Sequence, residues 1–418
     1  MNPNDNLVKK NKKEDVDVDI DMDTEGLLEE ENDLDQEIEK GFSFSSNNFA
    51  KNRMFKFMGI IIGIVIVLIL IMFLASVLFP KKYTYTAIEN ILEKAAIAYF
   101  KDYPDSLPKN DGSIVEIDSS NLTEAGKMKE LSEYTKEGTT CTGTVQVEKS
   151  SNTYLYTPFL NCGASYTTTE LYKKITSDSE IVTTGYGLYN VNGTYIYRGE
   201  DVNNFVELDR GLWRIVKITP NNNIVLISNT GTSYGYPWDN RYNEKEAYDA
   251  GKNQYSVSRM KELLDKMYNN PSTKDTDDEY YISKKDRAKT VYFDLCVGKR
   301  TATSEAKDNS LECAEKLKNQ KIGLLTLSDY MYASLDPNCK NSTTKSCKNY
   351  NYLAKKKDWW LITADSSDNS KVFQIDQNGR VVSTVAGNYA GVRPVIYLNS
   401  KVLYKGGKGT LEKPYKVK

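Results

Sequence analysis

The chain has 418 residues, a formal net charge of −2, six cysteines and no histidine. The lack of histidine excludes Ser-His and Cys-His nucleophile pairs and zinc sites of the HExxH type, whereas catalysis by carboxylates alone stays open. Residues 1–50 hold 15 acidic residues and 5 lysines, a net of −10, which leaves +8 for residues 51–418. Because that positive charge is weak and dispersed, we expect no nucleic-acid partner.

Residues 1–56 are predicted to form a disordered acidic tail. They contain long acidic runs and few apolar residues, so burial cannot offset the loss of chain entropy. The segment EDVDVDIDMD (14–23) alternates acids with apolar residues at the period of a strand. It could add a strand to a partner's sheet, but we favour a solvated tail.

Residues 57–79, from Phe57 to Phe79, are 23 residues without one charge. A helix of this length reaches about 34 Å, which crosses a hydrocarbon core of about 30 Å. We therefore predict one transmembrane helix, with the lipid bilayer as its partner. Basic residues flank it on both sides, so charge does not orient it.

All six cysteines follow the apolar segment, which indicates that this side faces an oxidising exterior. The apolar segment also begins too late in the chain for an ordinary cleaved secretory signal. The predicted localisation is thus the cell membrane, with a single-pass signal anchor, a cytoplasmic N-terminus and extracellular C-terminal domains.

A small extracellular α+β domain is predicted over 83–167. Apolar residues recur at helical spacing over 85–103, and a short helix is expected near 123–133. The stretch TGTVQVEKSSNTYLYTPFL (142–160) alternates on both sides of a polar turn and predicts a hairpin. Cys141 and Cys162 flank its open ends, so we expect a disulfide between them.

Residues 168–418 are predicted to form a second extracellular α+β domain. Strands are expected at 212–218, 223–228, 358–363 and 392–398, and helices at 256–269 and 311–318. Trp359 and Trp360 should point to opposite faces of their strand, because side chains alternate along it. Arg393 lies in a run that should be buried, so we expect it to form an ion pair.

The remaining four cysteines allow three connectivities, of which we favour Cys296 with Cys313 and Cys339 with Cys347. Their spacing fits no common zinc motif. DTDDE (275–279) is interpreted as a solvated loop rather than a metal site, and DQNG (376–379) as a hairpin turn rather than a calcium loop. We therefore predict no metal and no cofactor.

Several blocks of the second domain resemble a bacterial cell-surface domain of unknown function that is itself similar to C-type-lectin-like folds. They are LWRIVKI (212–218), NIVLIS (223–228), IGLLTLSDY (322–330), DWWLIT (358–363), DQNG (376–379) and GVRPVIYL (391–398). The resemblance covers roughly residues 205–418 and implies a C-type-lectin-like domain on the surface of a Gram-positive-type bacterium. It implies no functional residues. The calcium-binding triplet and loop of sugar-binding C-type lectins are missing, which speaks against calcium-dependent sugar binding.

The segment SYGYPWDNRY (233–242) is the candidate ligand surface. Aromatic residues flank a proline in a polar loop, a composition typical of sites that stack on sugars or anchor a protein partner. The alternative is that the tryptophan of this loop lies in the core. The candidate residues are Tyr236, Trp238, Asp239, Asn240, Arg241 and Tyr242.

Together these features predict a membrane-anchored extracellular recognition or adhesion protein, not an enzyme, whose partner is an extracellular protein or a glycan. One alternative is a structural subunit of an envelope or pilus-like assembly, because a helix packed on a hairpin outside an apolar helix resembles a type IV pilin in outline. Another is a carboxylate-dependent glycosidase of the envelope.

Overall fold

The structure is a computed structural model of the chain, and it describes residues 83–136, 139–209, 211–244, 250–269, 282–354 and 356–418. The predicted acidic tail (1–56), the predicted membrane helix (57–79) and the acidic loop DTDDE (275–279) lie outside these ranges.

The predicted fold class requires a correction. The described residues form a mixed α/β fold with seven helices and many strands, and none of these helices is long and apolar enough to cross a membrane. The longest of them, α3 (Tyr85–Asp102), carries charged residues such as Glu93 and Lys94 among its apolar ones. It is therefore a helix with one apolar face, which packs against a sheet.

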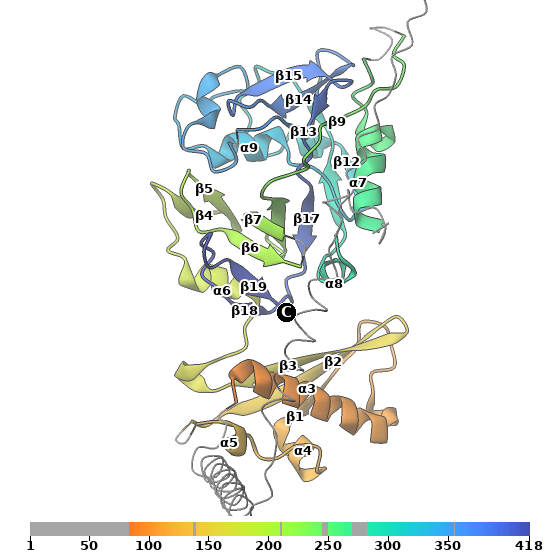
Figure 1. Cartoon of the computed structure of the whole chain (residues 1–418), viewed down its shortest axis with the longest axis vertical. Helices are drawn as coiled ribbons and strands as arrows, with labels where there is room; N and C mark the ends of the chain where they lie inside the picture. Colours follow the sequence, from red (N-terminus) through yellow and green to blue (C-terminus); the bar gives the residue numbers. More distant parts are fainter. Residues whose placement is uncertain (1–82, 137–138, 210, 245–249, 270–281, 355) are drawn as a thin grey trace, which may run out of the picture. The chain divides into compact units, whose positions relative to one another are not determined.

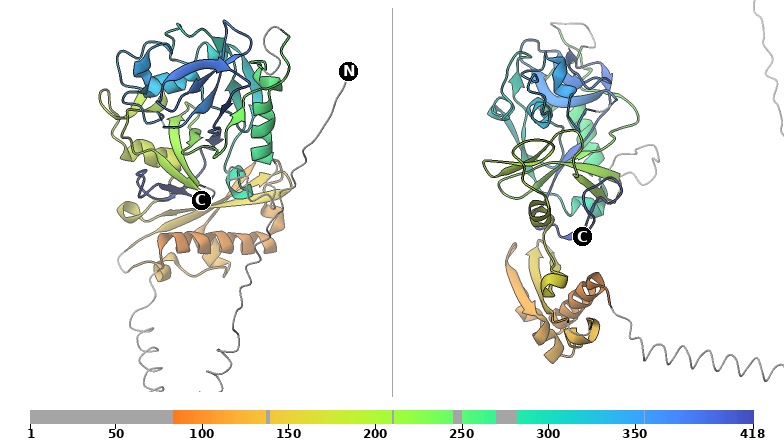
Figure 2. Two further views of the ribbon diagram at one scale, coloured as in Figure 1. Left: turned by 45° about the horizontal axis from the view of Figure 1, so that its top comes forward. Right: turned by 90° about the vertical axis from the view of Figure 1, so that its left-hand side faces the viewer.

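Helix α3 covers a three-stranded antiparallel sheet of order β1-β2-β3 and buries Ile88, Leu92 and Phe100 against it. Thr84 caps the helix, accepting a hydrogen bond from the Ala87 amide at 3.2 Å. The helix lies across the sheet in both views of Figure 2. The remaining elements of this part are β1 (Ile114–Asp118), α4 (Ser119–Glu124), α5 (Leu131–Tyr134), β2 (Thr142–Ser150) and β3 (Thr153–Asn161).

The predicted hairpin is confirmed. Strands β2 and β3 pair from Thr142 opposite Asn161 to Ser150 opposite Thr153, and Ser151 takes a positive φ of 53° in the turn. Val145 and Val147 point into the core beneath α3. This alternation of buried and exposed positions is what the sequence pattern predicts.

A second, larger hydrophobic core spans residues from Leu171 to Tyr415. Its main sheet has eight strands, six in the order β17-β8-β7-β6-β19-β18, and hairpin β4–β5 joins through pairing of β5 with β7 (Figure 1). The strands are β4 (Gly187–Val191), β5 (Thr194–Arg198), β6 (Phe205–Leu208), β7 (Gly211–Ile218), β8 (Ile224–Ser228), β17 (Val395–Leu398), β18 (Tyr404–Gly406) and β19 (Tyr415–Val417).

A second sheet of order β11-β13-β14-β15 completes this part, with two short pairs beside it, β10 with β12 and β9 with β16. The central strand β13 is buried along its whole length, so Trp359 and Trp360 face opposite sides and both lie in the core. The strands are β9 (Tyr236–Pro237), β10 (Phe293–Cys296), β11 (Lys299–Arg300), β12 (Lys316–Gln320), β13 (Trp359–Asp365), β14 (Lys371–Ile375), β15 (Val381–Val385) and β16 (Tyr389–Ala390).

The helices of this part are α6 (Leu171–Asp178), α7 (Arg259–Asn269), α8 (Lys284–Arg287) and α9 (Leu327–Ala333). Helix α7 confirms the predicted helix at 256–269, but the predicted helix at 311–318 is wrong. A 3-10 turn (Glu312–Ala314) leads there into strand β12, which pairs with β10. A disulfide between Cys296 and Cys313 ties the two segments together, and tertiary pairing overrides the local helical pattern.

Candidate functional site

The predicted ligand loop places its tryptophan in the core. Trp238 is fully buried, its indole N–H donates to the Leu361 carbonyl at 3.1 Å, and its ring lies 5.9 Å from that of Tyr255. The alternative reading of this residue is therefore the one the structure shows. Trp238 therefore has no exposed ring face that could stack on a ligand.

Asp239 is also fully buried, and its carboxylate organises the loop. Arg241 donates to both carboxylate oxygens, at 2.8 and 3.1 Å, and the Lys252 amide donates at 2.9 Å. Gly251 passes so close that a Cβ added there would lie 1.8 Å from the Asp239 carbonyl oxygen. The carboxylate thus fixes the backbone and is closed to a ligand.

The other predicted site residues are more accessible. Asn240 and Tyr242 are exposed, while Tyr236 and Arg241 are half-buried. The Tyr236 carbonyl accepts a hydrogen bond from the Trp360 indole at 2.7 Å, so its backbone supports the core. Only the tip of the loop is left as possible ligand surface.

Arg393 corrects a second expectation, because it forms no ion pair with a described carboxylate. Its side chain is 1% exposed. Its Nε donates to the Ser228 carbonyl at 2.9 Å and its Nη1 to the Leu353 carbonyl at 3.3 Å, and the guanidinium lies 4.6 Å from the Trp359 ring centroid. Backbone oxygens and an aromatic face take the place of the expected carboxylate.

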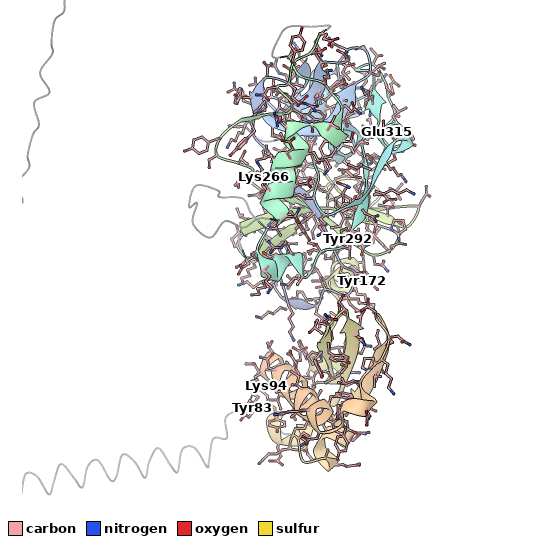
Figure 3. The ribbon with its side chains drawn as sticks, turned by 90° about the vertical axis from the view of Figure 1, so that its right-hand side faces the viewer. Tyr83, Lys94, Tyr172, Lys266, Tyr292 and Glu315 are labelled. Carbon is pink, nitrogen blue, oxygen red and sulfur yellow. A yellow bond between two sulfur atoms is a disulfide. The ribbon has the colours of Figure 1, made fainter. Side chains whose placement is uncertain are left out.

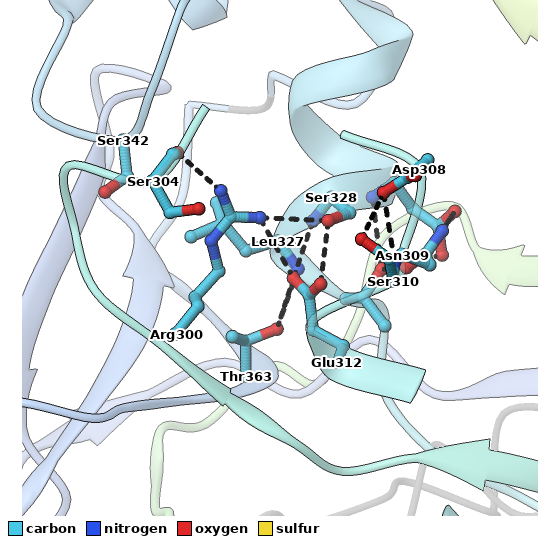
Figure 4. Close-up of polar contacts among 12 residues, drawn as sticks. Arg300, Ser304, Asp308, Asn309, Ser310, Glu312, Leu327, Ser328, Ser342 and Thr363 are labelled. Carbon is cyan, nitrogen blue, oxygen red and sulfur yellow. Dashed lines mark hydrogen bonds and ion pairs between the residues drawn. The ribbon is translucent and has the colours of Figure 1, made fainter. Parts of the chain in front are cut away.

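A buried ion pair joins strand β11 of the second sheet to the 3-10 turn Glu312–Ala314, and Ser328 of helix α9 hydrogen-bonds to both partners (Figure 4). Arg300 and Glu312 lie 3.3 Å apart with side chains that are 0% exposed. Glu312 also accepts hydrogen bonds from the Ser328 amide and hydroxyl, at 3.1 and 2.8 Å, and from Thr363 at 3.4 Å. All of these hydrogen-bond partners belong to the protein's own buried core, and solvent does not reach the carboxylate. We therefore interpret the cluster as a stabilising contact of the core and not as an acid–base site.

The prediction of disulfide bonds is confirmed. Cys141 is joined to Cys162, Cys296 to Cys313 and Cys339 to Cys347, and the described residues contain no free cysteine. The loop closed by Cys339 and Cys347 leads directly into an open pocket of this part.

That site is a polar pocket with a volume of about 650 Å³, which we call the tyrosine pocket. Three segments form it: Glu200 just beyond β5, the segment after the third disulfide and the turn between β14 and β15. Its lining residues are Glu200, Lys348, Asn349, Tyr350, Asn351, Ala354, Lys356, Gln377, Asn378 and Gly379.

Tyr350 is held in a strained conformation at the pocket. Its φ is 49°, a left-handed value that is a genuine outlier for a bulky side chain, and the side chain is 50% exposed. The side chain of the next residue, Asn351, holds the surrounding backbone, because its Nδ2 donates to the carbonyls of Tyr330 and Cys347 at 2.9 and 2.8 Å. Local strain combined with exposure is typical of ligand-contacting residues.

Tyr186 stands beside Tyr350, with ring centroids 6.2 Å apart and planes at 39°. A Cβ added to Gly199, whose φ is +108°, would lie 2.5 Å from the Tyr186 ring. The ring therefore packs directly against the Gly199 backbone. Gly199 is held in place by two backbone hydrogen bonds, one to Ala333 and one from Tyr352. It is still 44% exposed, so part of the ring is open to a ligand.

The turn DQNG forms the opposite wall of the tyrosine pocket, and its predicted hairpin is confirmed. The Asp376 carboxylate accepts hydrogen bonds from the amides of Asn378 and Arg380 at 2.9 and 2.8 Å. The Gly379 carbonyl accepts from the buried Tyr330 hydroxyl at 2.6 Å. This leaves the side chains of Gln377 and Asn378 exposed at the pocket on a rigid turn.

Sequence reasoning identified the disulfide loop and this turn, but it did not bring them together as a site. The available signal was an aromatic residue with amide neighbours, KNYNY, placed directly after a cysteine pair. The partners Tyr186 and Gln377 carry no local signal of their own, because only the packing of the sheets brings them to Tyr350. Comparison with known protein families, with curated proteins and with solved structures found no match to this chain.

Proposed function

We propose that this protein is an extracellular recognition protein that binds a saccharide chain in the tyrosine pocket. The observation that carries the proposal is the strained, half-exposed Tyr350, which lines an open polar pocket and lies beside the Tyr186 ring. Aromatic faces offer stacking surface for the C–H face of a sugar ring. Amide side chains such as those of Gln377 and Asn378 supply both donors and acceptors for its hydroxyl groups.

Pre-organisation of the pocket supports binding. The walls are held before a ligand arrives by the disulfide Cys339–Cys347, by the side-chain amide of Asn351 and by the hydrogen bond from the Tyr330 hydroxyl to the Gly379 carbonyl. A pocket that is already ordered loses less entropy on binding than a mobile one. The three disulfides, which persist in oxidising compartments, support the extracellular location.

The test compares two tyrosine substitutions in the full chain on an array of immobilised oligosaccharides. Asparagine tolerates a left-handed backbone, so Tyr350→Asn should remove the ring and relieve strain without harming the fold. We expect it to weaken binding of the preferred oligosaccharide by roughly fivefold, because a stacking contact of this kind is worth about 1 kcal/mol. Thermal stability should be unchanged or slightly higher.

The matched control is Tyr292→Asn. Tyr292, labelled in Figure 3, is 60% exposed and does not line the tyrosine pocket. The Tyr292→Asn variant should bind the saccharide as tightly as the parent chain does. Equal saccharide binding by the parent chain and by Tyr350→Asn, or no binding to any saccharide, would contradict the proposal.

A further inference from the structure

Two exposed tyrosines form an aromatic surface at the tip of the loop 233–242. Tyr234 and Tyr389 are each 70% exposed, and we call this pair the aromatic surface. They come from distant parts of the sequence, which strands β9 and β16 bring together by pairing Tyr389 with Pro237. A Cβ added to Gly235, next to Tyr234, would lie 3.3 Å from the Cβ of Tyr389. The two tyrosines therefore belong to backbone segments in close contact.

The core holds the backbone beneath the aromatic surface. The Trp360 indole donates from the second sheet to the Tyr236 carbonyl at 2.7 Å, and Figure 1 shows strand β9 beside β13. The Thr232 hydroxyl donates to the Tyr234 carbonyl at 2.7 Å and accepts from the Val392 amide at 2.9 Å. Exposed tyrosines on a fixed backbone provide stacking area at a low cost in entropy.

The first link between this surface and the tyrosine pocket runs through two lysines. Lys356 lines the pocket. The ammonium group of the next residue, Lys357, donates to the carbonyls of Thr232 and Ser233, which directly precede Tyr234. The backbone that carries Tyr234 is thus attached to the neighbour of a pocket residue.

Asp358 provides the second link. Its carboxylate accepts a hydrogen bond from the amide of Gln377, which lines the tyrosine pocket, at 2.7 Å. Its backbone carbonyl accepts from the amide of Gly391 at 2.9 Å, two residues beyond Tyr389. Both tyrosines of the aromatic surface are therefore connected to the wall of the pocket through the segment 356–358, which spans at most about 11 Å even when extended.

We propose that the aromatic surface binds further sugar units of the chain held in the tyrosine pocket, so that the ligand is a long β-1,4-linked polysaccharide. This inference rests on the proposed function. A β-1,4-linked pyranose chain is flat and extended, and it presents C–H faces that can stack on rings at separate places. Ser233 and Asn388, the sequence neighbours of the two tyrosines, are exposed polar residues, which favours a hydroxylated ligand over an apolar protein surface.

The probes are two β-1,4-linked series, one of N-acetylglucosamine and one of glucose, each as a disaccharide and as a hexasaccharide. The disaccharide occupies the pocket alone, whereas the hexasaccharide can extend from the pocket to the aromatic surface. We expect the full parent chain to bind the hexasaccharide of one series about tenfold more tightly than its disaccharide in a calorimetric titration, because two further rings stack on it.

The double variant Tyr234→Ser/Tyr389→Ser removes both rings of the aromatic surface and leaves the pocket unchanged. It should bind the disaccharide as tightly as the parent chain does. For the hexasaccharide it should keep only the few-fold gain that a longer chain has because it can occupy one site in several positions. The control Tyr292→Ser removes an exposed ring outside the tyrosine pocket and the aromatic surface, and it should keep the whole gain.

Three outcomes would overturn this inference. A double variant with the full gain of the parent chain would show that the aromatic surface holds no sugar, while the proposed function stands. A double variant that loses the disaccharide as Tyr350→Asn does would show that the aromatic surface is no extension of the pocket. If neither series binds but another saccharide does so through Tyr350, the β-1,4-linked assignment fails and the proposed function stands.

Discussion

Arg393 shows how a single buried charge is accommodated without a counter-ion. Burial, and then the positive charge of Arg214, lower the pKa of Arg393 to about 9, so the group is still charged at neutral pH. Its planar guanidinium reaches two backbone carbonyls on separate segments and lies over the Trp359 ring. The compact ammonium group of a lysine at this position could neither reach both carbonyls at once nor stack on the Trp359 ring.

We therefore predict that Arg393→Lys lowers the free energy of unfolding by about 2 kcal/mol or more, because it leaves a buried charge poorly paired and a carbonyl unsatisfied. Urea denaturation followed by fluorescence measures the change. The control is Arg259→Lys, since Arg259 is 52% exposed and pairs with Glu262 on the surface of α7. It should cost less than about 0.5 kcal/mol. Equal effects of the two substitutions would show that the guanidinium geometry of Arg393 is unimportant.

At the scale of elements, the disulfide-closed loop between α9 and β13 links stability to the binding surface. Cys339 and Cys347 are eight residues apart and fully buried, and the Cys347 carbonyl accepts a hydrogen bond from the side-chain Nδ2 of Asn351, the residue next to Tyr350. Removing the cross-link should release the covalent restraint on this segment without touching the ring itself.

The double variant Cys339→Ala/Cys347→Ala should lose about 2–3 kcal/mol of stability, the value expected for a loop of this length. It should also bind saccharide several-fold more weakly at a temperature where it is still folded. The matched variant Cys141→Ala/Cys162→Ala opens a loop of 21 residues in the other hydrophobic core. It should lose at least as much stability and keep its affinity. A loss of affinity in both would indicate general unfolding rather than a local role.

For the whole molecule, acid sensitivity follows from aspartates whose pKa is lower in the folded chain. The ammonium group of Lys371, followed by the Ser370 amide, lowers the pKa of Asp368 to about 2, and the Ser310 hydroxyl lowers the pKa of Asp308. Because the unfolded chain takes up protons first, this stabilisation is complete above pH 4 and is lost as the pH falls toward 2.

Thermal denaturation between pH 5 and 2 should therefore show a steadily falling melting temperature. Asp368→Asn should flatten that fall, with an effect of at most about 1 kcal/mol, because the carboxylate is partly exposed and solvent screens the pair. At pH 7 the variant should be less stable than the parent chain, and near pH 2 the two should converge. A constant difference at all pH values would rule out the ionised pair as the cause.

Local patterns predicted the elements whose partners lie close in the chain. Helix α3, hairpin β2–β3 and the turn DQNG each depend on short-range spacing, and they were predictable for that reason. The helix expected at 311–318 failed because pairing with β10 and a disulfide decide that segment, and both involve a distant partner. The lectin-like resemblance and the domain boundaries stay predictions.

The sequence by itself determined the absence of histidine chemistry, the alternation that builds the hairpin and the cysteine pairs of short separation. Only the tertiary structure decided that Trp238 belongs to the core, that Arg393 pairs with carbonyls, and that Tyr350 and the turn near Gln377 share one pocket, with Tyr186 beside Tyr350. The reason is physical. Periodicity and short loops act between neighbours in the chain, whereas burial and pocket formation depend on segments that are distant in the sequence and meet only when the chain folds.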